Sequence, residues 1–582
     1  MAAMLRIRDE VENNMNRYSL LILLTGILLP AAGARAVDSL VLQAEQKRVE
    51  VLEKISPAVV AIFGQDGNGG GSGVLISPDG YALSNFHVTS GAGNFMKCGL
   101  NDGVLYDAVI VGIDPTGDVA LVKLLGRDDF PHATIGDSDT VKVGDWAYAI
   151  GNPFLLATDY QPTVTYGIVS GVHRYQYPAG TFLEYADCIQ VDSSINPGNS
   201  GGPLFNDAGE LVGINGRGSF EKRGRVNSGA GYAISINQIM YFLDHLRSGR
   251  IVDHATLGAT VVTDREGRVI VDSILESSEA YRRGLRLDDE IVSFAGRPIR
   301  SVNQFKNVLG IYPKGWRLPL TYRREEQKYD VQVRLRGVHT RAELMPKDLN
   351  LGPAPPPGHP KAKEPPKPPE QYAHMFEDKP GFANWWFNLE EQKRLLPRVE
   401  SWGDWKSSTS TRLTLAGKNG DGDDFRISLT DRGVGMEMRG EPYVQPLDGS
   451  EFLDEPPGSG GLLTALHHLK RLLTQGASGF SEFYYLGSEP LSLTGDRVDV
   501  IVSSLNGVEC RWYFTTERPA FVGFSCQLTE DRDECEVFFA TVDEFDGRFF
   551  PGQILIRSAG RDYLTLKVES VRVEPDTTSP QS

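Results

Sequence analysis

Short apolar runs alternate with turn residues over the first part of the chain. Between residues 56 and 247, runs rich in valine, isoleucine and alanine are separated by glycine, aspartate and asparagine. Strands that recur at such short spacing are typical of an all-β barrel or sandwich. We therefore predict an all-β domain here, with strands at residues 59–63, 73–76, 109–111, 120–124 and 146–150.

A smaller mixed region follows at residues 257–335. Strands are expected at residues 269–274 and 290–294, and a helix at residues 302–309. Beyond it, nearly half of residues 352–370 are proline, which predicts an extended polyproline-type spacer. The alternative is that this tract is a ligand for a proline-reading domain.

A third region covers residues 381–573. Its leucines recur at three- and four-residue spacing and predict one apolar face of a helix, while alternating runs after the helix predict strands. We expect an α+β domain dominated by antiparallel sheet. The leucines are Leu462, Leu463, Leu466, Leu469, Leu472 and Leu473, and the strands are expected at residues 498–502, 509–514, 536–541 and 563–568.

Length and composition narrow the class of protein. The chain has 582 residues, of which 40% are hydrophobic, so it is expected to contain several domains and is not wholly disordered. Its 59 basic and 76 acidic residues give a net charge of −17, which disfavours nucleic acid as a partner. Five cysteines are too few for a disulfide scaffold, and none lies in a zinc-type spacing.

The N-terminus resembles an export signal. Arg17 precedes the apolar run at residues 20–29, and Ala34 and Ala36 supply the small residues of a cleavage site. Cleavage after Ala36 would leave the mature protein in the periplasm or cell envelope. The alternative is an uncleaved membrane anchor, and a start at Met15 rather than Met1 would give a cleaner signal.

Three stretches in the first region carry candidate chemistry. Residues 71–88 end at His87, residues 117–123 place Asp118 before an apolar strand, and residues 196–204 surround Ser200 with glycines. A serine hydroxyl needs a neighbouring base to become a nucleophile, and a carboxylate can orient the imidazole of that base. The three residues therefore predict a His-Asp-Ser catalytic triad.

The glycines around Ser200 also predict an oxyanion hole. They allow the backbone to direct the N–H groups of Gly198 and Ser200 at one point. The chain order His, Asp, Ser is that of the double β-barrel proteases. No GxSxG motif surrounds Ser200, which argues against an esterase.

These stretches, together with residues 133–138, 143–154 and 229–234, resemble HtrA/DegP-type serine proteases. The resemblance covers about residues 56–340. It implies a chymotrypsin-like double β-barrel with His87 as base, Asp118 as orienting acid and Ser200 as nucleophile.

Other residues near Ser200 suggest specificity and control. Ile195 lies where the floor of the specificity pocket is expected, and the resemblance places Tyr232 and Ala233 beside that pocket. With no acid in reach, the pocket is expected to prefer small or medium apolar side chains. Asn199 replaces the acid that pairs with a new N-terminus in digestive relatives, so control is expected to involve loop ordering. The resemblance places Arg174 in a regulatory loop; the alternative is a surface arginine.

The middle region resembles a PDZ domain through residues 257–259 and 277–291. PDZ domains bind an extended peptide at a sheet edge and hold its C-terminal carboxylate. By this resemblance Leu257, Gly258 and Ala259 would bind C-terminal peptides. The alternative is a structural domain with a blocked groove.

The third region faintly resembles LolA-like lipoprotein carriers at residues 545–556. That resemblance implies a curved sheet around a helix, binding an apolar ligand. A plain accessory packing domain is the alternative.

The HtrA family is often trimeric through N-terminal aromatic contacts, but residues 37–62 contain no aromatic residue, so a homo-oligomer stays an open question.

No cofactor or metal site is predicted. Asn419, Asp421 and Asp423 alternate as in a calcium loop, but glycine and glutamate are missing at the required positions. Neighbouring residues His467 and His468 point in different directions on a helix. One disulfide could form among Cys510, Cys526 and Cys535, with its pairing open.

Together these features predict an exported, multidomain serine endopeptidase. It would cleave misfolded or unassembled envelope proteins without ATP, through an acyl-enzyme, with regulation by the PDZ domain. The alternatives are a client-binding protein with vestigial proteolysis and a lipid or lipoprotein carrier. The expected parts are a signal peptide (1–36), a protease domain (37–250), a PDZ domain (251–340), a proline-rich linker (341–380), an α+β domain (381–575) and a tail (576–582).

Overall fold

The computed structural model divides the chain into two compact units, residues 1–54 and 55–582. In the first unit the structure describes helix α2 (Ser39–Ile55), whose last residue begins the second unit. The predicted signal peptide, most of the proline-rich tract and the tail lie outside the described residues. Within the described part, no helix is long and apolar enough to cross a membrane. The described residues are 39–67, 70–152, 159–176, 183–196, 198–220, 227–340, 343–344, 368–406, 411–447, 451–491 and 494–575.

The first half of the protease region is a closed six-stranded barrel in the order β1-β2-β3-β6-β5-β4. The turn at residues 77–80 joins two of its strands, and Gly80 adopts a positive φ of 97° there. The strands predicted at residues 59–63, 109–111 and 120–124 lie within the observed ones, whereas the strand predicted at residues 73–76 ends one residue earlier, at Leu75. The elements are β1 (Val59–Gly64), β2 (Gly71–Leu75), β3 (Tyr81–Ser84), helix α3 (Phe86–Ala92), β4 (Phe95–Gly99), β5 (Leu105–Asp114) and β6 (Val119–Leu124).

The second half is a seven-stranded sheet in the order β11-β8-β9-β10-β13-β12-β7. An additional pairing between β11 and β12 closes it on itself, so the two halves fit the predicted double barrel. The elements are β7 (Thr134–Ile135), β8 (Trp146–Gly151), β9 (Thr163–Gln176), β10 (Tyr185–Val191), β11 (Pro203–Phe205), β12 (Glu210–Phe220), β13 (Asn227–Ser235) and helix α4 (Ile236–Arg247).

The middle domain is a sheet in the order β15-β16-β17-β19-β20, with β15 at one edge. The predicted helix forms as α6 (Val302–Gly310), because the hydroxyl of Ser301 accepts a hydrogen bond from the Gln304 amide at 3.1 Å and caps its first turn. The other elements are β14 (Ala255–Thr256), β15 (Ala259–Thr263), β16 (Val269–Ile274), α5 (Glu279–Arg282), β17 (Glu290–Phe294), β18 (Arg297–Pro298), β19 (Arg317–Arg324), β20 (Gln327–Arg334) and β21 (Arg336–Gly337).

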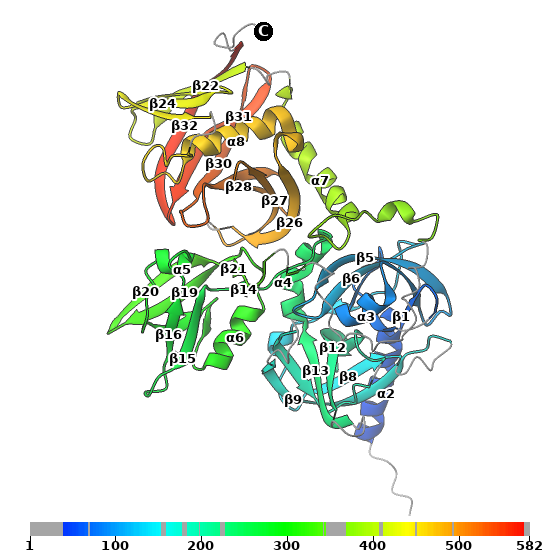
Figure 1. Cartoon of the computed structure of the whole chain (residues 1–582). Helices are drawn as coiled ribbons and strands as arrows, with labels where there is room; N and C mark the ends of the chain where they lie inside the picture. The colour runs from blue at the N-terminus through cyan, green and yellow to red at the C-terminus, as the bar shows by residue number, and fades with distance from the viewer. Residues whose placement is uncertain are drawn as a thin grey trace, which may run out of the picture. The chain divides into compact units, whose positions relative to one another are not determined.

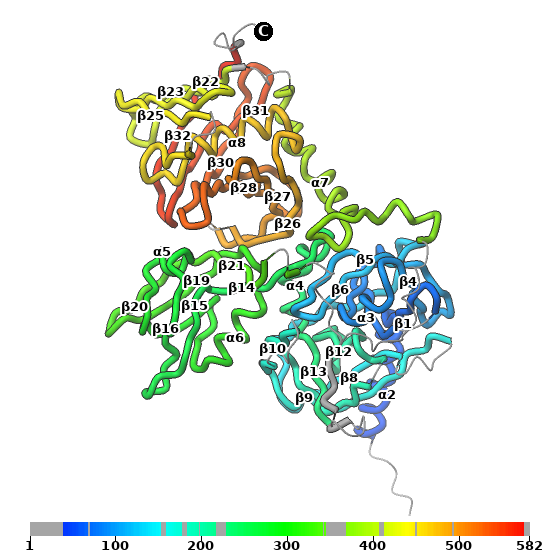
Figure 2. The backbone as a smooth tube through the Cα atoms, in the orientation of Figure 1, coloured from blue at the N-terminus to red at the C-terminus, as the bar shows by residue number. Residues whose placement is uncertain are grey.

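The C-terminal domain is one eleven-stranded antiparallel sheet in the order β25-β24-β23-β22-β32-β31-β30-β29-β28-β27-β26. Figures 1 and 2 show the sheet curving around α8, whose leucines are buried among the strands. The elements are α7 (Trp385–Glu400), β22 (Thr411–Asn419), β23 (Asp424–Leu429), β24 (Gly433–Met438), β25 (Glu441–Pro446), α8 (Leu462–Gln475), β26 (Glu482–Pro490), β27 (Arg497–Leu505), β28 (Val508–Thr515), β29 (Phe521–Gln527), β30 (Cys535–Phe545), β31 (Arg548–Ser558) and β32 (Arg561–Pro575).

The described end of the predicted linker packs against the protease region. The rings of Phe376 and Phe95 lie 6.1 Å apart, and the Asn384 amide donates to the carbonyl of Ile110 at 2.9 Å. The expected spacer therefore ends in ordered contacts that bring α7 back to the first barrel.

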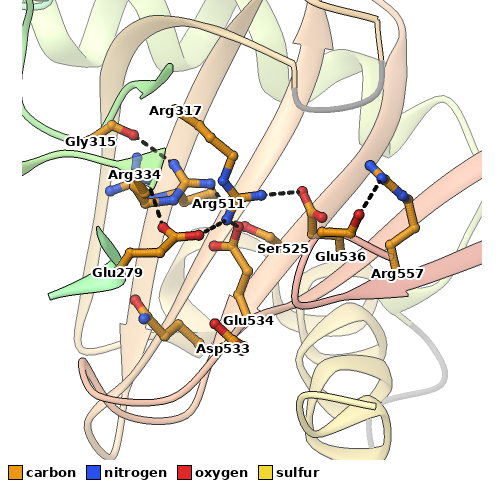
Figure 3. Close-up of polar contacts among 12 residues, drawn as sticks. Glu279, Gly315, Arg317, Arg334, Arg511, Ser525, Asp533, Glu534, Glu536 and Arg557 are labelled. Atoms are coloured by element: carbon orange, nitrogen blue, oxygen red, sulfur yellow. Dashed lines mark hydrogen bonds and ion pairs between the residues drawn. The ribbon is translucent and has the colours of Figure 1, made fainter. Parts of the chain in front are cut away.

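Buried charges join the middle and C-terminal domains (Figure 3). Arg317 on β19 pairs with Glu534 and lies 3.0 Å from Glu536, while Arg334 on β20 lies 2.9 Å from Glu534. The Arg317 side chain is only 6% exposed. Burial raises the pKa of Glu534, but the charges of Arg317 and Arg334 outweigh burial and hold it below its ordinary value. The buried arginines and glutamates of this cluster therefore neutralise one another across the two domains.

Ser488 on β26 connects the C-terminal domain to helix α4 and to the middle domain. The Ser488 hydroxyl donates to Asp244 on α4 at 2.6 Å, and its carbonyl accepts from the indole of Trp316 at 2.9 Å. The Ser488 carbonyl also lies 3.1 Å from Nε2 of His245. Burial lowers the pKa of His245 to about 3, so the ring is neutral and can donate this bond.

The disulfide forms between Cys510 and Cys526, which are directly paired on β28 and β29. Cys535 is a buried free thiol. The sequence left this pairing open.

Candidate active site

The first barrel brings His87 and Asp118 together. His87 lies in α3, directly after the β2–β3 hairpin, and Asp118 precedes β6. Nδ1 of His87 lies 3.0 Å from Oδ1 and 2.8 Å from Oδ2 of Asp118, and the His87 backbone N–H donates to Oδ1 at 3.0 Å. Asp118 is fully buried, whereas the His87 side chain is 41% exposed. The imidazole is thus fixed on one side and open on the other.

Asp118 is held by its backbone as well. It adopts a φ of +57°, in the left-handed region that side chains other than glycine rarely occupy. Its carbonyl accepts hydrogen bonds from the Phe86 amide at 3.2 Å and from the Asn85 side chain at 2.9 Å. The preceding turn is closed by Asp114, which accepts from the Gly117 amide at 2.8 Å. These contacts keep the Asp118 carboxylate under the imidazole.

The environment makes His87 a stronger base than a free histidine. Partial burial lowers its pKa, but the charge and hydrogen bond of Asp118 outweigh burial and raise the pKa above its ordinary value. The carboxylate therefore stabilises the imidazolium form that a general base reaches after taking a proton.

The loop that carries Ser200 is fastened to β2. The Ser72 hydroxyl donates to the Gly198 carbonyl at 2.6 Å, and the Ser72 amide donates to the Ser200 carbonyl at 2.9 Å. Gly198 has a φ of +103°, and a Cβ on Gly201 would lie 2.2 Å from the Ser72 carbonyl oxygen. Because of these constraints the loop needs glycine at both positions.

Ser200 makes its own hydrogen bond away from the histidine. Its hydroxyl donates to the Gly216 carbonyl at 3.1 Å. Among the residues that the structure describes, no hydrogen bond joins Ser200 to His87. Rotation of the Ser200 side chain would be needed to reach His87.

The predicted pocket residues divide into two groups. Ile195 and Ala233 are both buried in one apolar cluster with Val191. Tyr232 is half-buried on β13, and as the strand neighbour of Ala233 its side chain points to the opposite face. The cluster therefore brings together Ile195 and Ala233 but not Tyr232.

Arg174 lies on β9, paired in register with Cys188 of β10. It lines a cavity of about 660 Å³ together with residues of the middle domain, including Arg297 and Asn307. The Asn307 side chain accepts from the Asp187 amide at 2.9 Å and donates to the His173 carbonyl at 2.7 Å. Helix α6 is thus hydrogen-bonded to β9, the strand that carries Arg174, and to the neighbouring strand β10.

The segment predicted to bind peptides leads into the open edge strand β15. Leu257 is buried in the core of the middle domain, and Gly258 has a φ of +74°. The Gly258 carbonyl accepts from the Leu275 amide at 2.8 Å, and Ala259 begins β15. The turn is thus ordered directly before β15, which is an edge strand in the described part of the sheet.

Where the structure describes the chain, two groups of metal-ligand-type side chains lie close together, and members of both have other partners. A ring nitrogen of His468 lies near the sulfurs of Cys510 and Cys526, but these sulfurs form the disulfide. Asp139, His173 and Asp187 also converge. Arg297 lies 2.8 Å from Asp139 and 3.5 Å from Asp187, and supplies the positive charge there.

The sequence did not single out Ser72 or Tyr185. The Tyr185 hydroxyl donates to Oδ2 of Asp118 at 2.6 Å. Ser72 is fully buried in an apolar strand, and this mismatch between a polar residue and its apolar neighbours was a usable signal. Tyr185 gives no such signal, because a tyrosine at the start of a strand is ordinary.

Comparison with known proteins finds peptidases similar to the region that holds these residues. Residues 71–214 match the trypsin-like peptidase domain family. A probable periplasmic serine endoprotease DegP-like of Chlamydia trachomatis is 34% identical over 46% of this chain and 54% of its own length. Periplasmic serine endoprotease DegP of Escherichia coli is 35% identical over 47% of this chain and 60% of its own length.

The chain is a relative of the DegP/HtrA-type serine proteases. It spans about half the length of the curated relatives it matches. A solved structure titled "HtrA-type protease AlgW with tripeptide" is 30% identical, with a TM-score of 0.42, over 50% of this chain and 98% of that chain. The His87–Asp118 pair and Ser200 all lie inside the peptidase match of this DegP/HtrA relative.

Proposed function

We propose that this chain is a serine endopeptidase that works in the periplasm or cell envelope. The observation that carries the proposal is the buried Asp118 carboxylate bonded to an imidazole that is open on its other side. A glycine-rich loop presents Ser200 on the same domain, inside the peptidase match. The names of the periplasmic relatives support the location.

In the proposed reaction, Ser200 turns from Gly216 to His87 and gives up its proton as it attacks the peptide carbonyl. The C–O bond forms and the carbonyl oxygen becomes an oxyanion, which accepts hydrogen bonds from the amides of Gly198 and Ser200. His87 then returns the proton to the departing amine, leaving an acyl-enzyme that water hydrolyses. Asp118 holds the tautomer of His87 throughout.

We propose a preference for small or medium apolar side chains at the cleaved bond. The buried cluster around Ile195 and Ala233 supports this specificity, because it offers no counter-charge to lysine or arginine. Substrates of this kind are exposed in misfolded exported proteins, which we propose as the physiological targets.

We propose that the middle domain is a PDZ domain that binds C-terminal peptides along β15. The ordered turn at Leu257 and Gly258 and the unpaired edge of β15 support this role. The bonds from Asn307 to the strands beside Arg174 support a regulatory role for that arginine. We propose that the C-terminal domain is an accessory domain that fixes the PDZ domain through the Arg317–Glu534 cluster.

The first experiment treats the chain from Val37 with a fluorophosphonate probe and with casein, beside Ser200→Ala. Labelling and cleavage that both disappear in Ser200→Ala are expected. If the unsubstituted chain is not labelled, peptides with free C-termini are added to occupy the PDZ domain. Failure of these peptides to restore labelling would overturn the protease proposal in favour of a client-binding protein.

A further inference from the structure

Within the described residues, three hydrogen-bond donors reach the carboxylate of Asp118, and only two of them belong to His87. The third is the Tyr185 hydroxyl, which lies 2.6 Å from Oδ2. This same oxygen lies 2.8 Å from Nδ1 of His87. Tyr185 and His87 therefore share one oxygen of the proposed orienting acid.

Tyr185 is held in this place from several directions. Tyr185 is only 4% exposed to solvent. The neighbouring Glu184 amide donates to the Thr116 carbonyl at 2.8 Å, which fastens the start of β10 to the turn before Asp118. On the other side, the Asp187 amide is bonded to Asn307 of α6 at 2.9 Å. The backbone around the tyrosine is thus fixed at both ends.

The space for the tyrosine ring depends on Gly216. A Cβ placed on Gly216 would lie 2.7 Å from Cε1 and 3.0 Å from the hydroxyl oxygen of Tyr185. The Gly216 carbonyl is also the acceptor of the Ser200 hydroxyl. One residue without a side chain therefore lies between the tyrosine ring and the Ser200 hydroxyl.

We propose that Tyr185 is a positioning residue for the triad: its hydroxyl fixes the rotamer of Asp118 and moderates the negative charge that Asp118 presents to His87. This inference rests on the proposed serine endopeptidase function. A buried carboxylate with one oxygen bonded by tyrosine cannot turn away from the imidazole without losing a charge-assisted hydrogen bond. Displacement of a catalytic group by about 1 Å can slow catalysis about 100-fold.

The test is Tyr185→Phe, which removes the hydroxyl and keeps the ring. We expect kcat on an apolar chromogenic peptide to fall about 10- to 100-fold, with KM changed less than about twofold. Without the tyrosine bond, Asp118 presents more negative charge to His87. The acid limb of the kcat/KM profile should therefore move to higher pH.

Tyr513→Phe is the matched control. Tyr513 is a buried tyrosine of the C-terminal domain whose hydroxyl lies 2.8 Å from Ser525, so this variant also loses one buried hydroxyl bond. A merely structural role for Tyr185 would lower the melting temperature of both variants and leave kcat and the pH profile of both unchanged. That result would overturn the proposal.

A second variant keeps the test valid if Tyr185→Phe fails to fold. Site-specific 3-fluorotyrosine at position 185 preserves the ring and hydroxyl but makes the hydroxyl a stronger donor. We expect the acid limb to move to lower pH, opposite to the phenylalanine variant, and an unmoved limb would contradict the proposal. If the unsubstituted chain is no more active than Ser200→Ala, the proposed function itself fails, which is a different outcome.

Discussion

Nε2 of His254 lies 2.8 Å from Oδ2 of Asp114, although the two residues are 140 positions apart in the chain. Nδ1 of the same ring lies 2.8 Å from the Gly310 carbonyl at the end of α6. The pair is almost completely buried. It connects the middle domain to the turn that ends at Asp118, because Asp114 also accepts from the Gly117 amide.

Asp114→Asn should destabilise the protein by about 3 kcal/mol, because it leaves a buried imidazolium without its counter-charge. Burial lowers the pKa of His254, but Asp114 outweighs burial and raises it above 6.5. The stabilisation is therefore fully present below pH 6.5 and is lost as pH rises through the raised pKa. Urea unfolding at several pH values measures this difference. Asp79→Asn, which breaks the pair between the half-exposed Asp79 and Lys123, should destabilise the protein less than Asp114→Asn does.

Glu534→Gln should destabilise the contact between the middle and C-terminal domains by about 3 kcal/mol, since Arg317 and Arg334 lose a shared buried partner. The pKa of Glu534 is lowered from 4.5, so its contribution is present above that pH and declines as pH falls further. Calorimetry at pH 7 and pH 4 tests both points. Glu530→Gln is the control, because Glu530 pairs with Arg336 but is 87% exposed. Equal effects of the two substitutions would contradict the prediction.

The pH dependence of peptide cleavage should follow His87. Only the neutral imidazole can accept the Ser200 proton, and Asp118 raises the pKa of His87 above 6.5. We expect kcat/KM to rise with pH through an apparent pKa above 6.5. In Asp118→Asn the limb should move to lower pH and kcat should fall about 10⁴-fold. A limb that stays in place in this variant would show that another group controls the profile.

Ser72→Ala should slow catalysis by about tenfold, because the Gly198 carbonyl loses the bond that sets the oxyanion loop. The rate of fluorophosphonate labelling measures the effect directly. Ser77→Ala is the control. The Ser77 hydroxyl lies in the β2–β3 turn and donates to Asp79 rather than to the oxyanion loop, so this variant should be labelled at the same rate as the unsubstituted protein. Equal labelling of all three proteins would contradict a role for Ser72.

The residues of the proposed triad could be predicted because each lies in a local pattern. The Pro-Asp-Gly turn before His87 and the glycines around Ser200 are visible within a few residues. Tyr185 could not be predicted, because its role depends on packing against Asp118, 67 positions away. The sequence likewise gave no sign that Arg317 is buried, since a lone arginine on a strand is usually exposed.

Gly216 illustrates a further limit. A glycine in a strand predicts a bulge or a close approach, but the approaching group is not visible in the sequence. Here it is the Tyr185 ring, and the same glycine accepts the Ser200 hydroxyl bond. In the C-terminal domain, the predicted strands lie within β27, β28, β30 and β32, and only the structure gave their order in an eleven-stranded sheet.

The buried cluster around Arg317 and Arg334 affects how truncations of this protein can be interpreted. A shortened chain ending before residue 381 would lose Glu489, Glu534 and Glu536 together. Glu279 would stay 3.3 Å from Arg317, but Arg334 would lose both of its carboxylate partners, so the remaining fragment would expose a new surface with excess positive charge, able to attract acidic polypeptides. A changed binding profile after such a deletion would report this artificial surface as well as the missing domain, and neutralising both arginines in the same fragment separates the two effects.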